Sequence, residues 1–423
     1  MKLNTLRSEY TDSMNFFGKL SPWELKAKYG TPLYVYNEQI LRQRCRDLMG
    51  LSDHPGFRVN YSVKANANLA LLRIIRSEGL VADSMSPGEL YVAMQAGFPS
   101  SEILYICNNV APEEMRFALD RDVLVGVDSL SQLEELGKVN RGGKAMVRFN
   151  PGIGAGHHRK VITAGAETKF GIGAGDIGEM LDILKRYNMT LAGINQHIGS
   201  LFLDPQGYLD AADVLLDIAR DFLNDLEIID FGGGFGIPYQ KYEGQERLDL
   251  AQIRDGFDSK IKAFSHETGY NGLFLIEPGR YISAECGLLL GSVYSTKNNG
   301  PIRFVGTDLG FNTLMRPALY SSFHDIEVYR KDSGPDKNLA TQTIVGNICE
   351  SGDILAKDRD LPEMKIGDLV AALDAGAYGY VMTSPYNQRQ RPAEVLIDEN
   401  GNDFLVRRRE TLEDLLHLTP IDV

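Results

Sequence analysis

Lys64 is the residue whose type and setting most directly suggest chemistry. It follows the short alternating segment Phe57–Val63 and precedes Ala65-Asn66-Ala67-Asn68. An amine at the carboxyl end of a buried strand is held rigidly and partly removed from water, which lowers its pKa and makes it a candidate for Schiff-base chemistry. By itself the segment fits a surface lysine at a strand-to-loop junction better. Other segments of the chain are needed to distinguish this interpretation from a Schiff-base lysine.

Three further segments place polar groups or glycines at the ends of expected strands. Gly232-Gly233-Gly234-Phe235-Gly236 would expose backbone N–H groups that can surround a phosphate, although a tight turn fits it as well. Glu277-Pro278-Gly279-Arg280 suits either a surface ion pair or contacts with a cofactor and a substrate carboxylate. His197-Ile198-Gly199-Ser200 offers a flat ring and a hydroxyl, yet a lone histidine more often has a structural role.

The later part of the chain contains three similarly ambiguous segments. Cys349-Glu350-Ser351-Gly352-Asp353 combines a thiol, acids and a hydroxyl, and this is also the composition of an ordinary turn. Arg316-Pro317-Ala318-Leu319-Tyr320 and Gly376-Ala377-Tyr378-Gly379-Tyr380 can be interpreted either way. The adjacent His157 and His158 lie in a glycine-rich loop and point apart, so we expect solvated histidines and no metal site.

Between about residues 55 and 280, the secondary-structure elements that must position these residues follow one repeating pattern. Short β-branched or aliphatic runs alternate with stretches of helical periodicity. Eight such units favour a (β/α)8 barrel, whose active site is built by the loops that follow the strands. A doubly wound sheet would need a topological switch and a fingerprint loop after its first strand, and neither is visible. The expected strands are Val59–Val63, Val81–Ser84, Ile103–Ile106, Leu124–Val127, Ala145–Phe149, Leu191–His197, Ile228–Phe231 and Leu273–Ile276.

After about residue 285 the pattern changes to short runs separated by turns, without long helices between them. This texture is typical of an all-β domain. We therefore expect a (β/α)8 barrel over residues 37–285 and a β-sandwich or β-barrel domain formed by residues 1–36 and 286–423. The strand expected at Pro32–Tyr36 could join either part.

Composition narrows the function classes. The net charge of −13 over 423 residues argues against a nucleic-acid or anionic-membrane partner. No stretch approaches the ~20 apolar residues of a membrane span, and the first residues lack the apolar core of a secretory signal, so we expect a cytoplasmic protein. The cysteines are scattered, which makes a disulfide framework or a structural zinc site unlikely: Cys45, Cys107, Cys286 and Cys349.

The order of these motifs resembles one family. The segments around Lys64, His197, Gly232–Gly236, Glu277–Arg280, Cys349–Asp353 and Gly376–Tyr380 follow one another as in the fold-type-III, pyridoxal-phosphate-dependent decarboxylases. The resemblance covers the chain from about Pro32 to Glu413. The Cys-Glu-Ser form, Tyr386-Asn387 and the Arg391–Val395 tail resemble the branch that acts on meso-2,6-diaminopimelate.

The resemblance implies that pyridoxal phosphate is the cofactor and that Lys64 forms a Schiff base with it. It also implies that Glu277 pairs with the pyridine nitrogen and that His197 stacks on the ring. Phosphate and neighbouring contacts would come from the glycine-rich loops, a hydroxyl, a guanidinium and an aromatic residue: Gly233, Gly234, Gly236, Gly279, Ser200, Arg280 and Tyr378.

For the substrate, the resemblance implies a diamino diacid that is converted to L-lysine and CO2 by a carboxy-lyase reaction. Arg280, Arg316 and Tyr320 would bind the distal carboxylate, with Tyr378 also near the substrate, because a guanidinium matches a carboxylate bidentately. Glu350 would bind the distal ammonium, and Cys349 would protonate the carbanion. In this family the Cys-Glu segment enters the neighbouring subunit's site, which implies a homodimer with shared active sites.

The sequence departs from the family pattern on the substrate side. Asn347, Ser321–Phe323, Pro385 and Gln388–Arg391 differ from the commoner residues. These differences leave open a related decarboxylase of lysine, ornithine, arginine or carboxynorspermidine, although such a substrate would not need Arg316. A non-catalytic cofactor-binding homologue is the remote alternative, and it should have lost Lys64 or Cys349. A racemase is disfavoured by Glu277.

Overall fold

The computed structural model describes residues 5–152, 170–331 and 339–420. The chain forms two compact units. One unit, called here the barrel unit, contains residues 42–237 and 246–282. The other, called the β unit, contains residues 1–41, 238–245 and 283–423. His157 and His158 lie outside the described residues.

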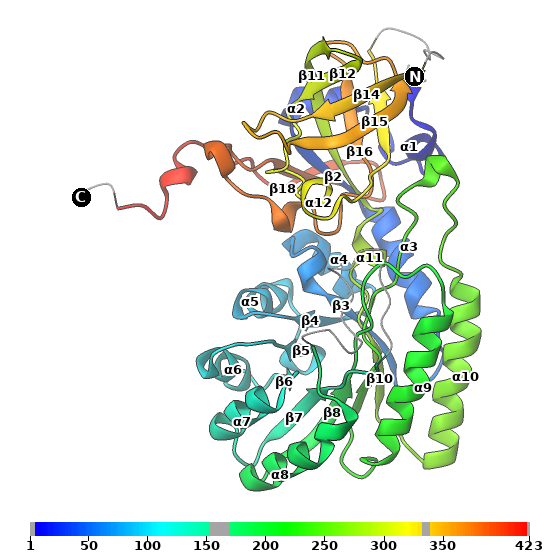
Figure 1. Cartoon of the computed structure of the whole chain (residues 1–423), viewed down its shortest axis with the longest axis vertical. Helices are drawn as coiled ribbons and strands as arrows, with labels where there is room; N and C mark the ends of the chain where they lie inside the picture. The colour runs from blue at the N-terminus through cyan, green and yellow to red at the C-terminus, as the bar shows by residue number, and fades with distance from the viewer. Residues whose placement is uncertain (1–4, 153–169, 332–338, 421–423) are drawn as a thin grey trace. The chain divides into compact units, whose positions relative to one another are not determined.

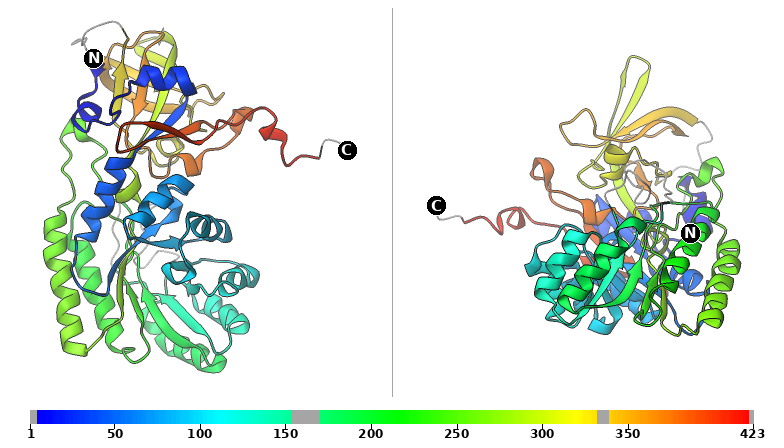
Figure 2. Two further views of the ribbon diagram at one scale, coloured as in Figure 1. Left: turned by 180° about the vertical axis from the view of Figure 1, so that it is seen from behind. Right: turned by 60° about the horizontal axis from the view of Figure 1, so that its bottom comes forward.

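The barrel unit confirms the predicted (β/α)8 fold. Eight strands close in the order β10-β3-β4-β5-β6-β7-β8-β9, and each pairs in parallel with its neighbours. Helices surround the strands in all views (Figures 1 and 2). The strands are β3 Phe57–Ser62, β4 Val81–Ser84, β5 Ile103–Ile106, β6 Leu124–Val127, β7 Lys144–Arg148, β8 Thr190–Asn195, β9 Ile228–Asp230 and β10 Leu273–Ile276. The helices are α3 Glu38–Met49, α4 Leu69–Ser77, α5 Pro87–Ala96, α6 Pro112–Leu119, α7 Leu130–Val139, α8 Ile177–Tyr187, α9 Gln206–Arg220 and α10 Leu250–Thr268.

Local sequence signals explain where the barrel helices begin. The side chains of Ser86, Ser129 and Asp249 each accept a hydrogen bond from a backbone N–H in the first turn of the helix that follows. Each cap satisfies a donor that has no partner inside the helix. Ser86 and Ser129 lie two residues after the ends of β4 and β6, so at these two positions the helix starts directly after the strand.

Inside the barrel, apolar side chains from separate strands fill the centre. Leu104, Ile106, Met146 and Leu275 form a buried cluster. Gly193 lies beside Met146, and a Cβ at Gly193 would come within 2.9 Å of the Met146 side chain. The glycine therefore gives the methionine room to cross the interior. The core is packed and leaves the chemistry to the strand ends.

The β unit is built on a 10-stranded sheet, as expected for an all-β domain. Its main path runs β1-β13-β16-β11-β12-β14-β15, with β2, β17 and β18 joined through β11. The expected strand at Pro32–Tyr36 belongs here, because β2 pairs with β11 and β17. The strands are β1 Thr5–Arg7, β2 Leu33–Asn37, β11 Gly287–Asn299, β12 Ile302–Thr307, β13 Ile326–Tyr329, β14 Leu339–Val345, β15 Ile354–Pro362, β16 Leu369–Ala372, β17 Ala393–Ile397 and β18 Asp403–Arg407. Its short helices include α1 Glu9–Ser13, α2 Pro22–Tyr29 and α12 Arg316–Tyr320, and the chain boundary at residues 282–283 falls within α11, Arg280–Ser283.

A segment from between β9 and α10, residues 238–245, belongs to the β unit. The Lys241 ammonium lies 2.5 Å from a carboxylate oxygen of Asp374 and 3.5 Å from Glu285, and both acids are fully buried. The backbone N–H groups of Lys241 and Tyr242 donate to Asp325. Buried charges are stable only when paired, so these contacts fix the segment firmly.

Neither a membrane-spanning helix nor a metal-binding cluster occurs among the described residues. None of their helices is long and apolar enough to cross a membrane. Nor do they contain a group of three or more histidine, cysteine or acidic side chains arranged to hold a metal ion.

Candidate active site

Lys64 follows β3 in a single 3-10 turn, Val63–Ala65. Its ammonium lies 4.0 Å from a carboxylate oxygen of Asp83, at the end of β4, and 3.5 Å from the sulfur of Met85. Asp83 is fully buried, whereas about a third of the Lys64 side chain is exposed. The amine therefore lies at the mouth of the barrel, oriented by an acid beneath it and open toward solvent.

Three acids meet at the carboxyl ends of β4, β9 and β10. Asp83 and Asp230 are fully buried and Glu277 is 5% exposed. Burial is the main reason that the pKa of Glu277 is raised well above its usual value, and repulsion from Asp230 and Asp83 adds to it. Burial likewise raises the pKa of Asp230 to about 7, although a hydrogen bond from Glu277 opposes the shift. The Asp230–Glu277 pair therefore keeps a proton at neutral pH.

Arg148, the last residue of β7, is a buried cation that sequence reasoning missed. It is 7% exposed and donates a hydrogen bond to the backbone carbonyl of His197. Burial lowers its pKa, while the charges of Glu277, Asp128, Asp83 and Asp230 raise it. Arg148 thus provides a counter-charge to the acids and supports the His197 backbone. Its position after the apolar residues Ala145-Met146-Val147 of β7 is the sequence signal from which it could have been predicted.

His197, predicted as the last residue of its strand, lies two residues beyond the end of β8, and its ring is held by the glycine-rich loop. Nδ1 accepts a hydrogen bond of 3.1 Å from the N–H of Gly233. Burial lowers the pKa of His197 well below its usual value, and the charges of Arg148 and Lys64 lower it further. The imidazole is therefore neutral, with its proton on Nε2.

The glycine-rich loop 232–236 depends on close backbone contacts that only glycine permits. A Cβ at Gly233 would lie 1.9 Å from the carbonyl oxygen of Glu277, and one at Gly234 would lie 2.4 Å from that of Gly199. Gly234 also has a φ of 107°. The loop is fixed at its start because the Gly232 N–H donates to Asp230. Among the described residues, the Gly234 N–H has no acceptor, so it can donate to a ligand.

Arg280 and Ser200 meet beside this loop. A guanidinium nitrogen of Arg280, 7% exposed, donates to the Ser200 hydroxyl over 2.9 Å. Gly279 lets the Glu277–Arg280 turn pack on the Lys64 turn, since a Cβ there would lie 2.9 Å from that of Ala65. A hydroxyl, a cation and backbone donors in this arrangement suit a phosphate group.

In the β unit, Arg316 starts α12 and is 2% exposed. One guanidinium nitrogen lies 2.9 Å from Nε2 of His324, whose Nδ1 lies 2.7 Å from the carbonyl oxygen of Leu373. The carbonyl can only accept, so Nδ1 carries the proton and Nε2 accepts from Arg316. The guanidinium also stacks on Tyr239 at 4.5 Å from the ring centre. Arg316 is therefore held in one orientation, with Tyr320 four residues further along the same helix.

Cys349 and Glu350 are both exposed and lie in the turn between β14 and β15. The Tyr386 hydroxyl donates to Oε1 of Glu350, and the Cys349 N–H donates to the side-chain oxygen of Asn387. The predicted turn is thus held by hydrogen bonds from a second loop.

Tyr378 has a left-handed backbone, with φ of 55°, which is uncommon for an aromatic residue. The glycines on either side allow this turn to pack tightly. A Cβ at Gly376 would lie 1.9 Å from the carbonyl oxygen of Ser283, and one at Gly379 would lie 2.2 Å from that of Ala375. Sparsely populated backbone conformations of this kind cost energy and often occur at functional sites.

The barrel residues fit pyridoxal phosphate. Oε1 of the buried Glu277 has no hydrogen-bond partner among the described residues, so an N–H from a pyridine ring would satisfy it. The Lys64 amine suits an aldehyde, and Gly234, Ser200 and Arg280 suit the phosphate. The structure brings all of the predicted barrel residues to one rim and adds Asp83, Arg148 and Asp230, which the sequence did not single out.

Comparison with known proteins agrees with this geometry. The model of the pyridoxal-dependent decarboxylase family, pyridoxal-binding domain, matches residues 39–284. The chain therefore belongs to the pyridoxal-dependent decarboxylases, and pyridoxal phosphate is its cofactor.

Relatives within the family point to one branch. The chain is 44% identical to the diaminopimelate decarboxylase of Methanothermobacter thermautotrophicus, covering 93% of this chain and 92% of the relative. It is 35% identical to that of Escherichia coli, covering 93% and 95%. A crystal structure of diaminopimelate decarboxylase from Helicobacter pylori with L-lysine matches with a TM-score of 0.86 and 31% identity, covering 94% of this chain and 99% of the other.

Proposed function

We propose that this chain decarboxylates meso-2,6-diaminopimelate and releases L-lysine and CO2. The family and the names of its relatives support this reaction. The observation that carries the substrate choice is Arg316, a buried guanidinium held by His324 and Tyr239. A guanidinium fork matches a carboxylate bidentately, and the diacid provides a distal carboxylate that a monocarboxylate lacks.

Bound pyridoxal phosphate supplies the electron sink that stabilises the carbanion left when CO2 departs. Each barrel residue has a role that follows from its position. Lys64 provides the amine for the aldehyde, directed by Asp83. Glu277 shares a proton with Asp230 and would pair with the ring nitrogen. The neutral His197 ring can lie against the pyridine ring without repelling its positive charge.

Remaining roles rest on the family resemblance and are proposed with it. Arg280, Ser200 and the glycine loop, together with Tyr378, would bind the phosphate. Arg280, Arg316 and Tyr320 would bind the distal carboxylate, and Glu350 the distal ammonium. Cys349 would return a proton to the carbanion carbon. We also propose a homodimer in which Cys349 and Glu350 serve the site of the neighbouring subunit, for which their exposed position is suitable.

CO2 release from a substrate panel tests the proposal: meso-diaminopimelate, D- and L-lysine, ornithine and arginine, each with the holoenzyme. We expect diaminopimelate to be turned over fastest, and faster turnover of a monocarboxylate would overturn the substrate assignment. The role of Lys64 is tested by borohydride reduction followed by peptide mass spectrometry. The cofactor mass should be found on the peptide containing Lys64 and should be absent from Lys64→Ala.

A further inference from the structure

The loop formed by residues 386–389 has an unusual backbone. Asn387 and Gln388 are consecutive non-glycine residues with φ of 56° and 54°. The left-handed region is sparsely populated by such residues, and each costs energy that the surrounding structure must offset. A loop that keeps two strained residues in succession is therefore held in place by its contacts.

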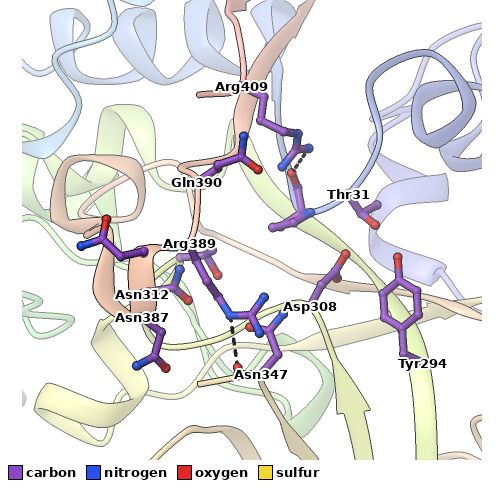
Figure 3. A pocket seen from close by; sticks show the side chains of 12 residues that line it. Thr31, Tyr294, Asp308, Asn312, Asn347, Asn387, Arg389, Gln390 and Arg409 are labelled. Atoms are coloured by element: carbon purple, nitrogen blue, oxygen red, sulfur yellow. Dashed lines mark hydrogen bonds between the residues drawn. The ribbon is translucent and has the colours of Figure 1, made fainter. Parts of the chain in front are cut away.

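Those contacts run residue by residue along the Cys349 segment. The Tyr386 hydroxyl donates to Oε1 of Glu350, Oδ1 of Asn387 accepts the Cys349 N–H over 3.1 Å, and Nε of Arg389 donates to the Asn347 carbonyl over 3.1 Å. Figure 3 shows the Arg389–Asn347 bond at the edge of a cavity that Asn387 also lines. Residues 386–389 and 347–350 thus lie side by side and run antiparallel to each other.

A buried acid, Asp353, supports the 347–350 segment. Asp353, 4% exposed, accepts hydrogen bonds of 2.7 Å from the N–H groups of Ile348 and Phe311. The Phe311 ring stacks on the Tyr386 ring, with centres 5.7 Å apart. Cys349 and Glu350 themselves are exposed, so burial does not hold them. Their positions depend on hydrogen bonds from the loop above and on the turn anchored by Asp353.

We infer that Tyr386 is a specificity-determining residue that aims Glu350, and that Asn387 is a positioning residue that sets the place of Cys349. The inference rests on the proposed function, in which Glu350 binds the distal ammonium and Cys349 donates a proton. The Tyr386 hydroxyl occupies Oε1, while Oε2 has no partner among the described residues. A neutral donor fixes the carboxylate without cancelling its charge, so the attraction for an ammonium is retained.

Asn387 acts on the backbone of Cys349, so its effect on the thiol is one of position. If the amide oxygen is removed, the Cys349 N–H loses its acceptor and the turn can move. The chemical step should then slow, whereas binding of the distal ammonium should not. Removing the Tyr386 hydroxyl should have the opposite pattern, because it disturbs Glu350 and leaves the Cys349 contact intact.

Steady-state kinetics of the holoenzyme with diaminopimelate separate these effects. Tyr386→Phe keeps the ring stacked on Phe311 and should raise KM about tenfold with little change in kcat, since a hydrogen bond to a charged group is lost. Asn387→Gly keeps the left-handed backbone and should lower kcat about tenfold at unchanged KM. Asn387→Asp still provides an oxygen acceptor for the Cys349 N–H, so its kcat should be close to that of the wild type and well above that of Asn387→Gly. Unchanged kinetics in both Tyr386→Phe and Asn387→Gly would overturn the inference.

Alkylation provides a readout that does not depend on turnover. Cys349 is exposed whereas Cys45, Cys107 and Cys286 are buried, so iodoacetamide should report on Cys349. The rate between pH 7 and 10 should change at least threefold in Asn387→Gly and remain the same in Tyr386→Phe. An equal rate in wild type and Asn387→Gly would remove the positioning role of Asn387.

Gln388→Gly is the matched control, because it changes the neighbouring left-handed residue and should leave both kinetics and alkylation unchanged. If it reproduces the Asn387→Gly effects, loop strain is responsible and the assignment to the amide is wrong. Failure of the wild type to release CO2 from diaminopimelate would instead refute the proposed function, and the alkylation comparison would still test Asn387.

Discussion

Asp230 and Glu277 extend from adjacent parallel strands, and their buried carboxyl groups hydrogen-bond to each other. Two carboxylates this close cannot both be ionised without strong repulsion, so the pair titrates as a unit. Glu277 is the donor in this bond, and the Gly232 N–H stabilises the ionised form of Asp230. The site therefore contains a proton before any ligand enters it.

This pairing makes the stability of the cofactor-free protein depend on pH. Burial raises the pKa of Asp230 from 3.8 to about 7, so between these values the folded protein binds more protons than the unfolded chain. The free energy of unfolding should consequently fall as pH rises from 4 to 8. We expect Asp230→Asn to remove up to about 4 kcal/mol of this fall, as measured by urea unfolding. Asp182→Asn, on the exposed face of α8, should retain the wild-type slope, and an identical slope in Asp230→Asn would contradict the prediction.

Arg148 should be most important where the surrounding acids are ionised. Arg148→Met leaves Asp83, Asp230 and Glu277 without their buried cation, and the loss of one partner from such a network typically costs about 3–5 kcal/mol. We expect this loss in urea unfolding at pH 8 and a smaller one at pH 5, because protonated acids need no counter-charge. A loss of equal size at both pH values would show that Arg148 acts through packing alone.

Alanine substitutions at Gly233 and Gly178 distinguish a glycine that the cofactor site needs from a glycine in an ordinary helix. In Gly233→Ala the new Cβ would lie 1.9 Å from the Glu277 carbonyl oxygen, so the loop must move and cofactor affinity should fall by at least tenfold. Gly178, in α8, has open space around it, and Gly178→Ala should stabilise the protein by about 0.5–1 kcal/mol. Fluorescence titration with pyridoxal phosphate and thermal unfolding measure the two effects. Equal cofactor affinity in the two variants would count against the loop's role.

Arg316→Lys tests the distal carboxylate contact. A lysine retains the charge but cannot form the planar contacts with His324 and a carboxylate together. We expect KM for diaminopimelate to increase about tenfold, while the inhibition constant of cadaverine, a diamine without a carboxylate, should change less than twofold. Matched increases for both ligands would mean that Arg316 maintains the fold of α12 and does not read the carboxylate.

Much of the barrel and its site could be predicted because the relevant signals are local. Strand and helix runs alternate visibly, Lys64 and Glu277 each directly follow an expected strand, and His197 ends one. Asp83 was different, since a lone acid within the four-residue strand Val81–Ser84 has no special local pattern. Its role arises only when β4 pairs with β3, which brings it beside Lys64, and when the barrel closes, which brings Glu277 near it.

The β unit was harder to predict in detail for a related reason. The strand β15 contains the charged run Lys357-Asp358-Arg359-Asp360, which has no apolar alternation. It forms a strand because its backbone pairs with β14, a contact between separate segments. The segment 238–245 likewise has no composition that assigns it to the β unit, since its place depends on Asp325 and Asp374, at least 80 residues away along the chain.

That segment has a consequence for how such a protein can evolve. The chain passes between the two units at residues 41–42, 237–238, 245–246 and 282–283, so neither unit is one uninterrupted stretch of gene. Recombination at a single boundary cannot exchange one unit without cutting the other. In descendants of an ancestor with this connectivity, both units would be inherited together. We therefore expect phylogenetic trees built from each unit's sequence to have the same branching order.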